Sequence, residues 1–248
     1  MLEVHDLHVD HGKISAVRGL SLSVEAGEIV AIVGANGAGK SSTLNALAGI
    51  IRSTRGSIRY DGREMAGRPA RSYIEAGIVQ VPEGRMNFRT LTVLENLQAG
   101  AYRLGSLLLS HISPEDVLQR FPVLADKLHE PASNLSGGQA QLLAVARGLM
   151  AKPSLLLLDE PTLGLSPIAA EDVFELIGTL RSEGLSILIV EQNVRQTLDL
   201  ADRGYIVEGG RVVQQGSARD LMDDDDLAAN YLGMKGVRVP ESMQMRVK

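Results

Sequence analysis

One short segment, Gly34-Ala35-Asn36-Gly37-Ala38-Gly39-Lys40-Ser41, constrains the fold of this chain more than any other. It follows an apolar run, Ile29–Val33, and opens a run with helical character, Ser41–Ala48. The glycines let backbone N–H groups turn toward an anion without a Cβ in the way, and the helix N-terminus behind them adds about half a positive charge. Strand, loop and helix in this order are the context that a phosphate-binding loop requires. The segment therefore predicts an α/β fold with a phosphate site at the end of a buried strand.

Two side chains at the end of this loop supply chemistry that backbone amides cannot. Lys40 provides a mobile cation for the β- and γ-phosphates of a nucleotide, and Ser41 offers a hydroxyl to Mg²⁺. We therefore expect a nucleotide and Mg²⁺ as ligands. The residues expected to contact the nucleotide here are Gly34, Asn36, Gly37, Ala38, Gly39, Lys40, Ser41 and Ser42.

A pair of acids follows a second apolar run. Leu155–Leu158 is a short buried-strand pattern that ends in Asp159 and Glu160. Asp159 at the strand end is placed to hold Mg²⁺ beside the phosphate loop. Glu160 points in another direction and suits a residue that orients and polarises an attacking water. Alone, this pattern also fits a strand that ends in exposed acids; downstream of a phosphate loop it predicts a hydrolytic nucleotide site.

Short apolar runs alternate with helical segments along the whole chain. Runs that are nearly all apolar are typical of parallel strands covered on both faces. The pair Gly209-Gly210 favours a hairpin turn, so we expect the last two strands to be antiparallel. The expected strands are Leu20–Val24, Glu28–Val33, Gly77–Val81, Ser154–Leu158, Ser186–Val190, Gly204–Val207 and Arg211–Gln215.

The segment from about Leu91 to Ala132 contains no good strand and indicates a helical insertion into the α/β chain. Helix starts are well marked. Thr92 with Glu95, and Ser136 with Gln139, have the spacing of capping boxes. Ser113-Pro114 and Ser166-Pro167 each place a cap residue before a proline at the first helical position.

The phosphate loop and the paired acids occur in kinases, switch GTPases and motors alike, so they do not identify the class. The discriminating segment is Leu135-Ser136-Gly137-Gly138-Gln139. A serine cap followed by two glycines exposes a second helix N-terminus suited to phosphate. In isolation the segment also fits a capped helix with a flexible start. One nucleotide can use both helix ends if they come from two subunits facing head to tail.

With these motifs in this order, the chain resembles the ATP-binding subunits of ABC transporters. The resemblance covers about residues 2–233 and includes Pro161-Thr162-Leu163-Gly164-Leu165-Ser166 after the paired acids. It implies a P-loop NTPase core with a mostly parallel sheet, an antiparallel β subdomain, and a helical subdomain at about 91–150 that carries the signature. It further implies one ATPase domain over 1–233 with a C-terminal tail at 234–248. Two ATP sites would be shared between two subunits, each using the partner's signature residues Ser136, Gly137, Gly138 and Gln139.

Three positions depart from the common family pattern. The family's Gln-loop position holds Glu83, which can still contact Mg²⁺ or water. The switch-histidine position holds Gln192, which can donate a hydrogen bond to the γ-phosphate but cannot take up a proton as histidine does. The adenine-stacking position holds His11, where Tyr is commoner. A bystander role at each position stays open at this point.

Several segments resemble the smaller ATPase of high-affinity branched-chain amino acid importers, and related urea and amide importers share much of the pattern. This resemblance implies a second ATPase subunit, two permease subunits and, indirectly, a periplasmic solute-binding protein as partners. We expect a heterodimer in the complex, with a homodimer possible in isolation. Contact with the permease is expected in the segment from Arg85 to Phe88. The segments are Val81–Arg85, Phe121-Pro122, Gly164–Pro167, Val190–Asn193, Ala201–Tyr205 and Tyr231–Gly233.

Composition limits the alternatives. The net charge is −5, and the aromatic residues are only five Tyr and three Phe, so a nucleic-acid partner is disfavoured. The chain has no Cys, which excludes disulfides and thiolate chemistry. We expect a peripheral location on the cytoplasmic face of the inner membrane. Two rivals remain: a soluble ABC-type clamp outside transport, and a partner subunit that binds ATP without turnover.

Overall fold

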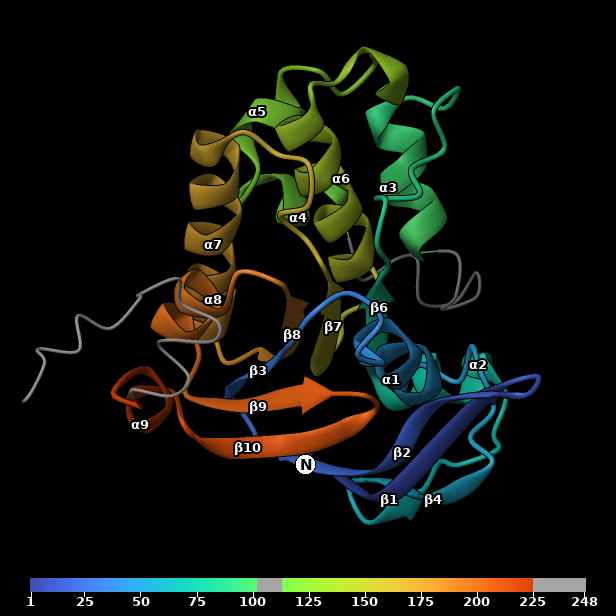
Figure 1. The fold of residues 1–248 in the computed structure, drawn as a ribbon. Helices are drawn as coiled ribbons and strands as arrows, with labels where there is room; N and C mark the ends of the chain where they lie inside the picture. The colour runs from blue at the N-terminus through green and yellow to red at the C-terminus, as the bar shows by residue number, and fades with distance from the viewer. Residues whose placement is uncertain (102–112, 225–248) are drawn as a thin grey trace, which may run out of the picture.

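A computed structural model describes residues 1–101 and 113–224. The described part contains two β-sheets with helix α1 (Lys40–Leu47) between them, and a group of helices on the far side of the larger sheet (Figure 1). The predicted C-terminal tail at 234–248 and the segment Tyr231–Gly233 lie outside the described residues.

The larger sheet has six strands in the order β10-β9-β3-β8-β7-β6. The five strands from β9 to β6 are parallel, and β10 is antiparallel to β9 as predicted. The strands are β3 (Ile29–Val33), β6 (Ile78–Val81), β7 (Leu155–Asp159), β8 (Ser186–Glu191), β9 (Arg203–Glu208) and β10 (Arg211–Ser217). All six match predicted strands to within two residues at each end.

The central strands of this sheet are buried on both faces. In β3, Val30 and Ile32 pack into one hydrophobic cluster with α1 and the smaller sheet. Ile29, Ala31 and Val33 pack into a second cluster with the helices on the other side. A fully apolar strand is therefore required here, because neither face meets water.

The smaller sheet is antiparallel, in the order β2-β1-β4-β5. Its strands are β1 (Leu2–His11), β2 (Ile14–Val24), β4 (Arg55–Tyr60) and β5 (Arg63–Glu64). The predicted strand Leu20–Val24 is the second half of β2. The sequence did not reveal β1, because register shifts between Val4 and Leu7 and again between Leu7 and His8 interrupt its alternation of apolar and polar residues.

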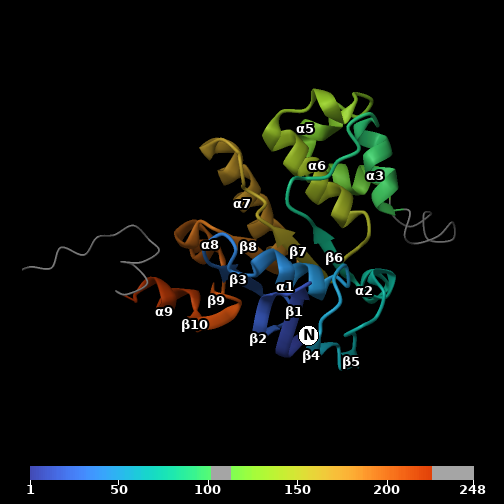
Figure 2. The same cartoon turned by 45° about the vertical axis from the view of Figure 1, so that its right-hand side comes forward.

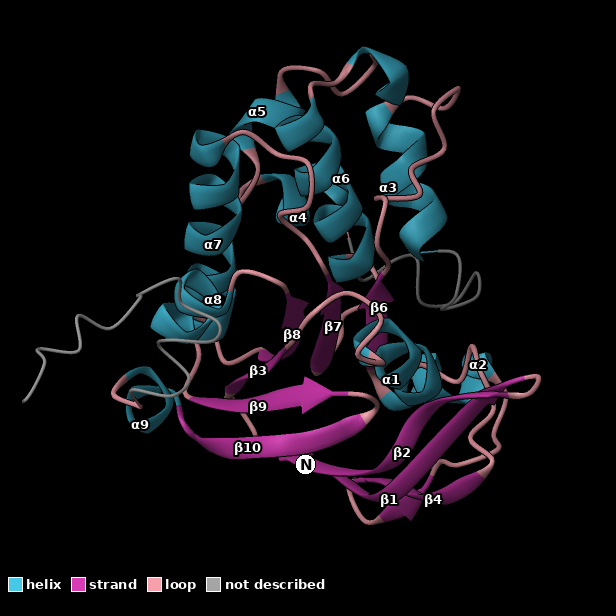
Figure 3. Ribbon diagram, in the orientation of Figure 1, coloured by secondary structure: helices cyan, strands magenta, loops and turns pink. Residues whose placement is uncertain are grey.

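The helices form two groups (Figures 1 and 2). Helices α3, α4, α5, α6 and α7 lie on the side of the larger sheet away from the smaller one, and α1 lies between the sheets. The colouring in Figure 3 separates these helices from the strands. Their bounds are α2 (Ala70–Ala76), α3 (Val93–Ala101), α4 (Pro114–Leu118), α5 (Pro122–Ala125), the 3₁₀ turn η3 (Ala132–Asn134), α6 (Gly137–Leu149), α7 (Pro167–Ser182), α8 (Val194–Leu200) and α9 (Ala218–Met222).

The predicted helix caps are present. Thr92 and Glu95 exchange hydrogen bonds at the start of α3. Ser136 accepts from the Gln139 backbone N–H while the Gln139 side chain accepts from the Ser136 backbone N–H, which completes the capping box of α6. Ser166 caps α7 by accepting from the Ala169 N–H, with Pro167 at the first helical position. These bonds satisfy backbone donors that a helix start otherwise leaves unpaired.

Within residues 1–101 and 113–224, no helix is both long enough and apolar enough to cross a lipid bilayer.

Candidate nucleotide-binding site

The parallel strands β3, β7 and β8 all end at one edge of the larger sheet, and the loops that follow them meet there. In open α/β sheets this carboxyl edge is where ligands bind. A cavity of about 480 Å³ lies at this edge. Its lining brings together nine of the predicted site residues, with Ala16 and Leu163 beside them: Asn36, Gly37, Gly39, Lys40, Ser41, Ser42, Glu83, Glu160 and Gln192.

The phosphate loop needs glycine at two crowded positions. Gly39 has φ 102°, and a Cβ there would lie 2.3 Å from the Ala16 carbonyl oxygen. A Cβ at Gly34 would lie 2.2 Å from the Val207 carbonyl oxygen. Strand β2 and the end of β9 therefore press against the loop, and only hydrogen fits between them. Ala38 is buried against the same elements, in the cluster between the sheets.

Lys40 points back into the loop. Its side chain is only 4 % exposed, and Nζ donates to the carbonyl oxygens of Gly34, at 2.9 Å, and Ala35, at 3.2 Å. The same ammonium lies 3.4 Å from Glu160 Oε1. A buried cation on the inner side of a glycine loop, at a helix N-terminus, fits the oxygens of a phosphate chain.

Ser41 and Asp159 are hydrogen-bonded across the site. Ser41 Oγ donates to Asp159 Oδ1 at 2.9 Å. Burial raises the pKa of Asp159 to about 6; nearby Glu83 and Glu160 add to this rise, while Ser41 and Lys40 oppose it. A hydroxyl and a carboxylate in contact are donors of the kind Mg²⁺ takes when it also binds phosphate and water. No group of three or more His, Cys, Asp or Glu side chains spaced for a metal exists among the described residues. The contact between Ser41 and Asp159 fits a Mg²⁺ ion at this position.

Glu160 links the two strand ends. Its Oε2 accepts from Gln192 Nε2 at 2.5 Å, while Oε1 faces Lys40. The Glu160 backbone has φ 45°, and its N–H donates to the Val190 carbonyl. A non-glycine residue in this left-handed region is held there by its surroundings, and such residues gather at functional sites. Glu160 and Gln192, each predicted as a site residue, are thus in direct contact.

One buried acid beside this pair was missed by sequence reasoning. Glu191 is 3 % exposed and follows the apolar run of β8, just as Asp159 follows that of β7. Burial raises its pKa, which hydrogen bonds from Thr162 partly offset. The sequence did contain a signal, because Glu191 directly follows the apolar run of β8. An acid next to a buried strand is expected to have hydrogen-bond partners, since burying a charged group without them is costly.

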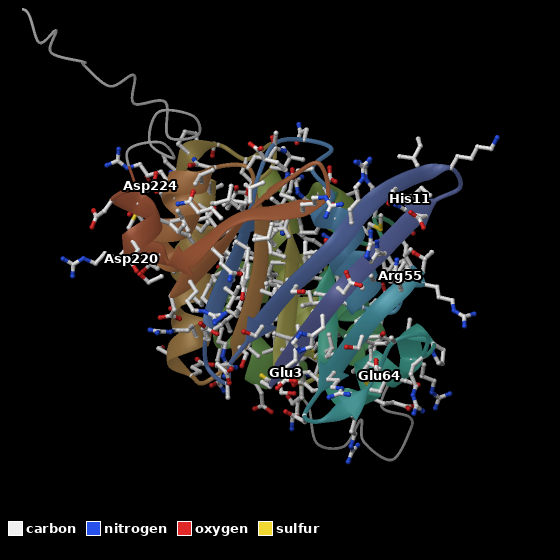
Figure 4. The ribbon with its side chains drawn as sticks, turned by 60° about the horizontal axis from the view of Figure 1, so that its bottom comes forward. Glu3, His11, Arg55, Glu64, Asp220 and Asp224 are labelled. Carbon is white, nitrogen blue, oxygen red and sulfur yellow. The ribbon has the colours of Figure 1, made fainter. Side chains whose placement is uncertain are left out.

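His11 lies at the end of β1, close to the tip of the β1–β2 hairpin (Figure 4). Its Nε2 is 3.0 Å from Ser42 Oγ. The ring is thereby tied to the first turn of α1 and lies beside the phosphate loop. It does not line the cavity described above.

The signature residues at the start of α6 lie outside the lining of this cavity. Ser136 and Gly137 are exposed at the start of α6, and none of Ser136, Gly137, Gly138 and Gln139 lines the cavity. A Cβ built on Gly137 would lie within 3.5 Å of Arg85 and 3.7 Å of Leu165. One chain therefore presents two separate helix ends, as expected if the second serves a partner.

The segment after Glu83 is held in an unusual conformation by α6. Arg85 has φ 68° and Met86 has φ 44°, and Arg147 donates to both of their carbonyl oxygens at 3.1 and 2.7 Å. The Arg147 guanidinium also lies 5.5 Å above the Phe88 ring. Met86 and Phe88 nevertheless remain 67 % and 51 % exposed.

Residues 17–163 match the family model described as ABC transporter, and that span contains the loop, the signature and the paired acids. The chain belongs to the ABC transporter family. It is an ATPase coupled to transport, and the predicted fold class, a P-loop NTPase core, is confirmed.

Two curated relatives of this ABC ATPase match along all or nearly all of their length. The high-affinity branched-chain amino acid transport ATP-binding protein BraG of Pseudomonas aeruginosa is 43% identical, over 94% of this chain and 100% of that protein. The lipopolysaccharide export system ATP-binding protein LptB of Haemophilus influenzae is 34% identical, over 94% of this chain and 97% of that protein. Among solved structures, the ADP conformation of MJ1267, an ATP-binding cassette of an ABC transporter, superimposes with a TM-score of 0.83 at 26% identity, covering 94% of this chain and 98% of that one.

Proposed function

We propose that this chain is the ATP-hydrolysing subunit of a bacterial importer of branched-chain amino acids. The observation that carries the proposal is the 43% identity to BraG over the full length of that protein. The identity to LptB proteins is lower, at 34% or less, although the coverage is similar. The amino acid importer pattern at Val190–Asn193 and Ala201–Tyr205 supports the same reading.

The site geometry supports a division of labour among the residues. Lys40 and the backbone of the loop from Gly34 to Gly39 bind the phosphates, and Ser42 extends this contact at the first turn of α1. Ser41 and Asp159 hold Mg²⁺, which supplies charge neutralisation to the transferred phosphoryl group. Glu83 lines the same cavity and provides a further oxygen on that side.

Glu160 and Gln192 act where water attacks. Glu160 orients the nucleophilic water and polarises it, and Gln192 orients Glu160 through their 2.5 Å hydrogen bond and donates to the γ-phosphate. Phosphoryl transfer needs little covalent help, so positioning and charge stabilisation account for the catalysis. His11, which contacts Ser42, is the residue against which the adenine base stacks.

The separation of the signature from the cavity supports a dimer in which each site is shared. Ser136, Gly137, Gly138 and Gln139 would contact the γ-phosphate bound by the partner's loop. The partner is a second ABC ATPase, and two permease subunits hold the pair at the cytoplasmic face of the inner membrane. Exposed Met86 and Phe88, presented beside α6, suit the contact with the permease.

The test is uptake in a reconstituted complex. The chain is assembled with a second ABC ATPase and two permease subunits of a branched-chain amino acid importer, in vesicles that contain the solute-binding protein. Radiolabelled leucine should enter on addition of MgATP, and Lys40→Ala in this chain should reduce uptake strongly. Uptake of urea or of another solute in place of leucine would overturn the amino acid assignment. ATP hydrolysis without any membrane association would overturn the transport role.

A further inference from the structure

The carboxylate of Glu191 joins two loops that leave the sheet at different strands. Its Oε1 accepts from the Thr162 backbone N–H at 2.9 Å and from the Thr162 hydroxyl at 2.7 Å. Its Oε2 accepts from the Gln192 backbone N–H at 3.2 Å. One side chain at the end of β8 therefore connects the loop after β7 to the switch position after β8.

A carboxyl group can accept from all three donors at once, because both of its atoms that face them are oxygens. A glutamine at this position would have one oxygen and one NH₂ group. Whichever way the amide is turned, its NH₂ group would then face a backbone N–H, and neither of these two donors could accept the other. The Thr162 hydroxyl can rotate to accept, but the backbone N–H groups of Thr162 and Gln192 cannot. Because the group is almost fully buried, a mismatched donor finds no water in its place.

Thr162 passes this constraint further along its loop. The Thr162 carbonyl accepts from the Leu165 N–H at 3.1 Å, and the Leu163 N–H donates to the Glu160 carbonyl at 3.1 Å. Leu163 lines the nucleotide cavity. Leu165 lies beside the signature glycine Gly137. The loop from Glu160 to Leu165 thus reaches the catalytic acid, the cavity wall and the signature.

We propose that Glu191 is a positioning residue for hydrolysis, which fixes the loop from Glu160 to Leu165 relative to Gln192 by bonding Thr162 and the Gln192 backbone with one carboxylate. The proposal rests on the nucleotide site described above. Glu191 touches none of the reacting groups; it acts through Thr162 and Gln192. Its loss lowers the rate of the chemical step and leaves nucleotide binding by the phosphate loop in place.

The experiment compares four variants of the full chain: Glu191→Gln, Thr162→Val, the double variant and Thr162→Ser. Binding of mant-ATP is measured by fluorescence, kcat is measured at saturating MgATP, and Tm is measured by calorimetry. We expect Glu191→Gln to lower kcat by about tenfold or more and to leave the mant-ATP Kd within about twofold of wild type. Thr162→Val should lower kcat by a smaller factor, and Thr162→Ser, which keeps the hydroxyl, should restore it.

The double variant identifies the route. If Glu191 acts through Thr162, the two changes are not additive, and the double variant is no slower than Glu191→Gln alone. Fully additive losses would overturn the proposal. So would a kcat of Glu191→Gln equal to wild type, or a Thr162→Val variant with unchanged turnover, which tests the link even if Glu191→Gln folds poorly.

Glu28→Gln is the matched control. Glu28 directly precedes β3, at the edge of the sheet opposite the nucleotide site. Its carboxylate also joins two donors, because it accepts from the Glu25 N–H at 2.8 Å and pairs with Arg203 at 2.9 Å. It should lower Tm without lowering kcat. If Glu28→Gln lowers kcat as much as Glu191→Gln does at the same loss of Tm, the effect of Glu191 is general destabilisation and the proposal fails. Lys40→Ala tests the nucleotide site separately from the role of Glu191. Retained mant-ATP binding in that variant would refute the nucleotide site itself.

Discussion

Gln192 donates its side-chain amide to Glu160 at 2.5 Å, across the gap between the ends of β8 and β7. Glu160 in turn faces the Lys40 ammonium at 3.4 Å, so the three side chains form a chain from the switch position to the phosphate loop. The two strands that carry Gln192 and Glu160 are adjacent in the sheet. A neutral amide therefore occupies the position that holds a histidine in the common family pattern, with no proton to gain or lose.

Replacing Gln192 tests this relationship. Gln192→Ala should slow turnover by about tenfold or more, because a hydrogen bond to a charged group contributes roughly 1.5–3 kcal/mol and each 1.36 kcal/mol is tenfold in rate. Gln192→His should keep activity and gain a pH dependence around pH 6–7, where histidine titrates. Steady-state ATPase rates across pH, in the assembled complex, provide the measurement. Equal rates for Gln192→Ala and wild type at every pH would make Gln192 a bystander.

Glu160→Gln should keep ATP binding and stop turnover. The substitution keeps size and hydrogen bonding, and removes the charge that polarises water. Light scattering with MgATP should then show a trapped dimer. Glu175→Gln, an exposed glutamate on α7, is the control for the charge change alone. Turnover of Glu160→Gln near the wild-type rate would contradict the role assigned to this acid.

Asp159→Asn should stabilise the chain in the absence of divalent metal at pH 7.5. Burial raises the pKa of Asp159 from 3.8 to about 6. Above that pH the buried carboxylate is charged in the folded chain, which costs more free energy than the same charge in the solvated unfolded chain and so destabilises the fold. The destabilisation is absent below pH 3.8, where both states are protonated, and grows as pH rises through the interval to about 6. At full extent it amounts to at most about 3 kcal/mol.

Thermal unfolding at pH 4.5 and pH 7.5, with EDTA, measures this effect. The gain in Tm from Asp159→Asn should be larger at the higher pH. With MgATP, wild type should gain Tm, while Asp159→Asn should gain less because one Mg²⁺ donor is weakened. A gain in Tm that does not vary with pH would indicate that ionisation of Asp159 is not its source.

Ser136→Arg should abolish hydrolysis while the same chain still binds nucleotide through its own loop. The reason is that, in the proposed dimer, Ser136 at the N-cap of α6 serves the site of the partner. In a homodimer, mixing Ser136→Arg chains with Lys40→Ala chains leaves one composite site with both defects and one with neither. Activity of the mixture above that of either parent is the expected result. No recovery, despite confirmed co-assembly, would rule out shared sites.

The sequence predicted the strands of the larger sheet well because each is buried on both faces and reads as a continuous apolar run. It also predicted the loop, Asp159 and Glu160, since their chemistry is local in the chain. Strand β1 was not predicted because its register is irregular around Asp6, which has φ 47°. This irregularity interrupts the alternation of apolar and polar residues that marks a strand. Glu191 was not predicted because its hydrogen-bond partner Thr162 is a neighbour in space and is distant in the sequence. The contact of His11 with Ser42 also joins residues that are distant in sequence.

The left-handed backbone at Arg85 and Met86 has a consequence for efforts to stabilise the subunit. Such conformations cost a non-glycine residue of order 1 kcal/mol or more, so a chain selected only for its own stability would carry glycine or asparagine there. This chain instead presents large side chains from a backbone that Arg147 clamps in place. Stabilising the isolated subunit by design, with glycine at 86, would therefore remove an apolar side chain that the subunit itself does not need. A screen for stability of the isolated subunit would therefore favour loss of a side chain that the proposed permease contact uses.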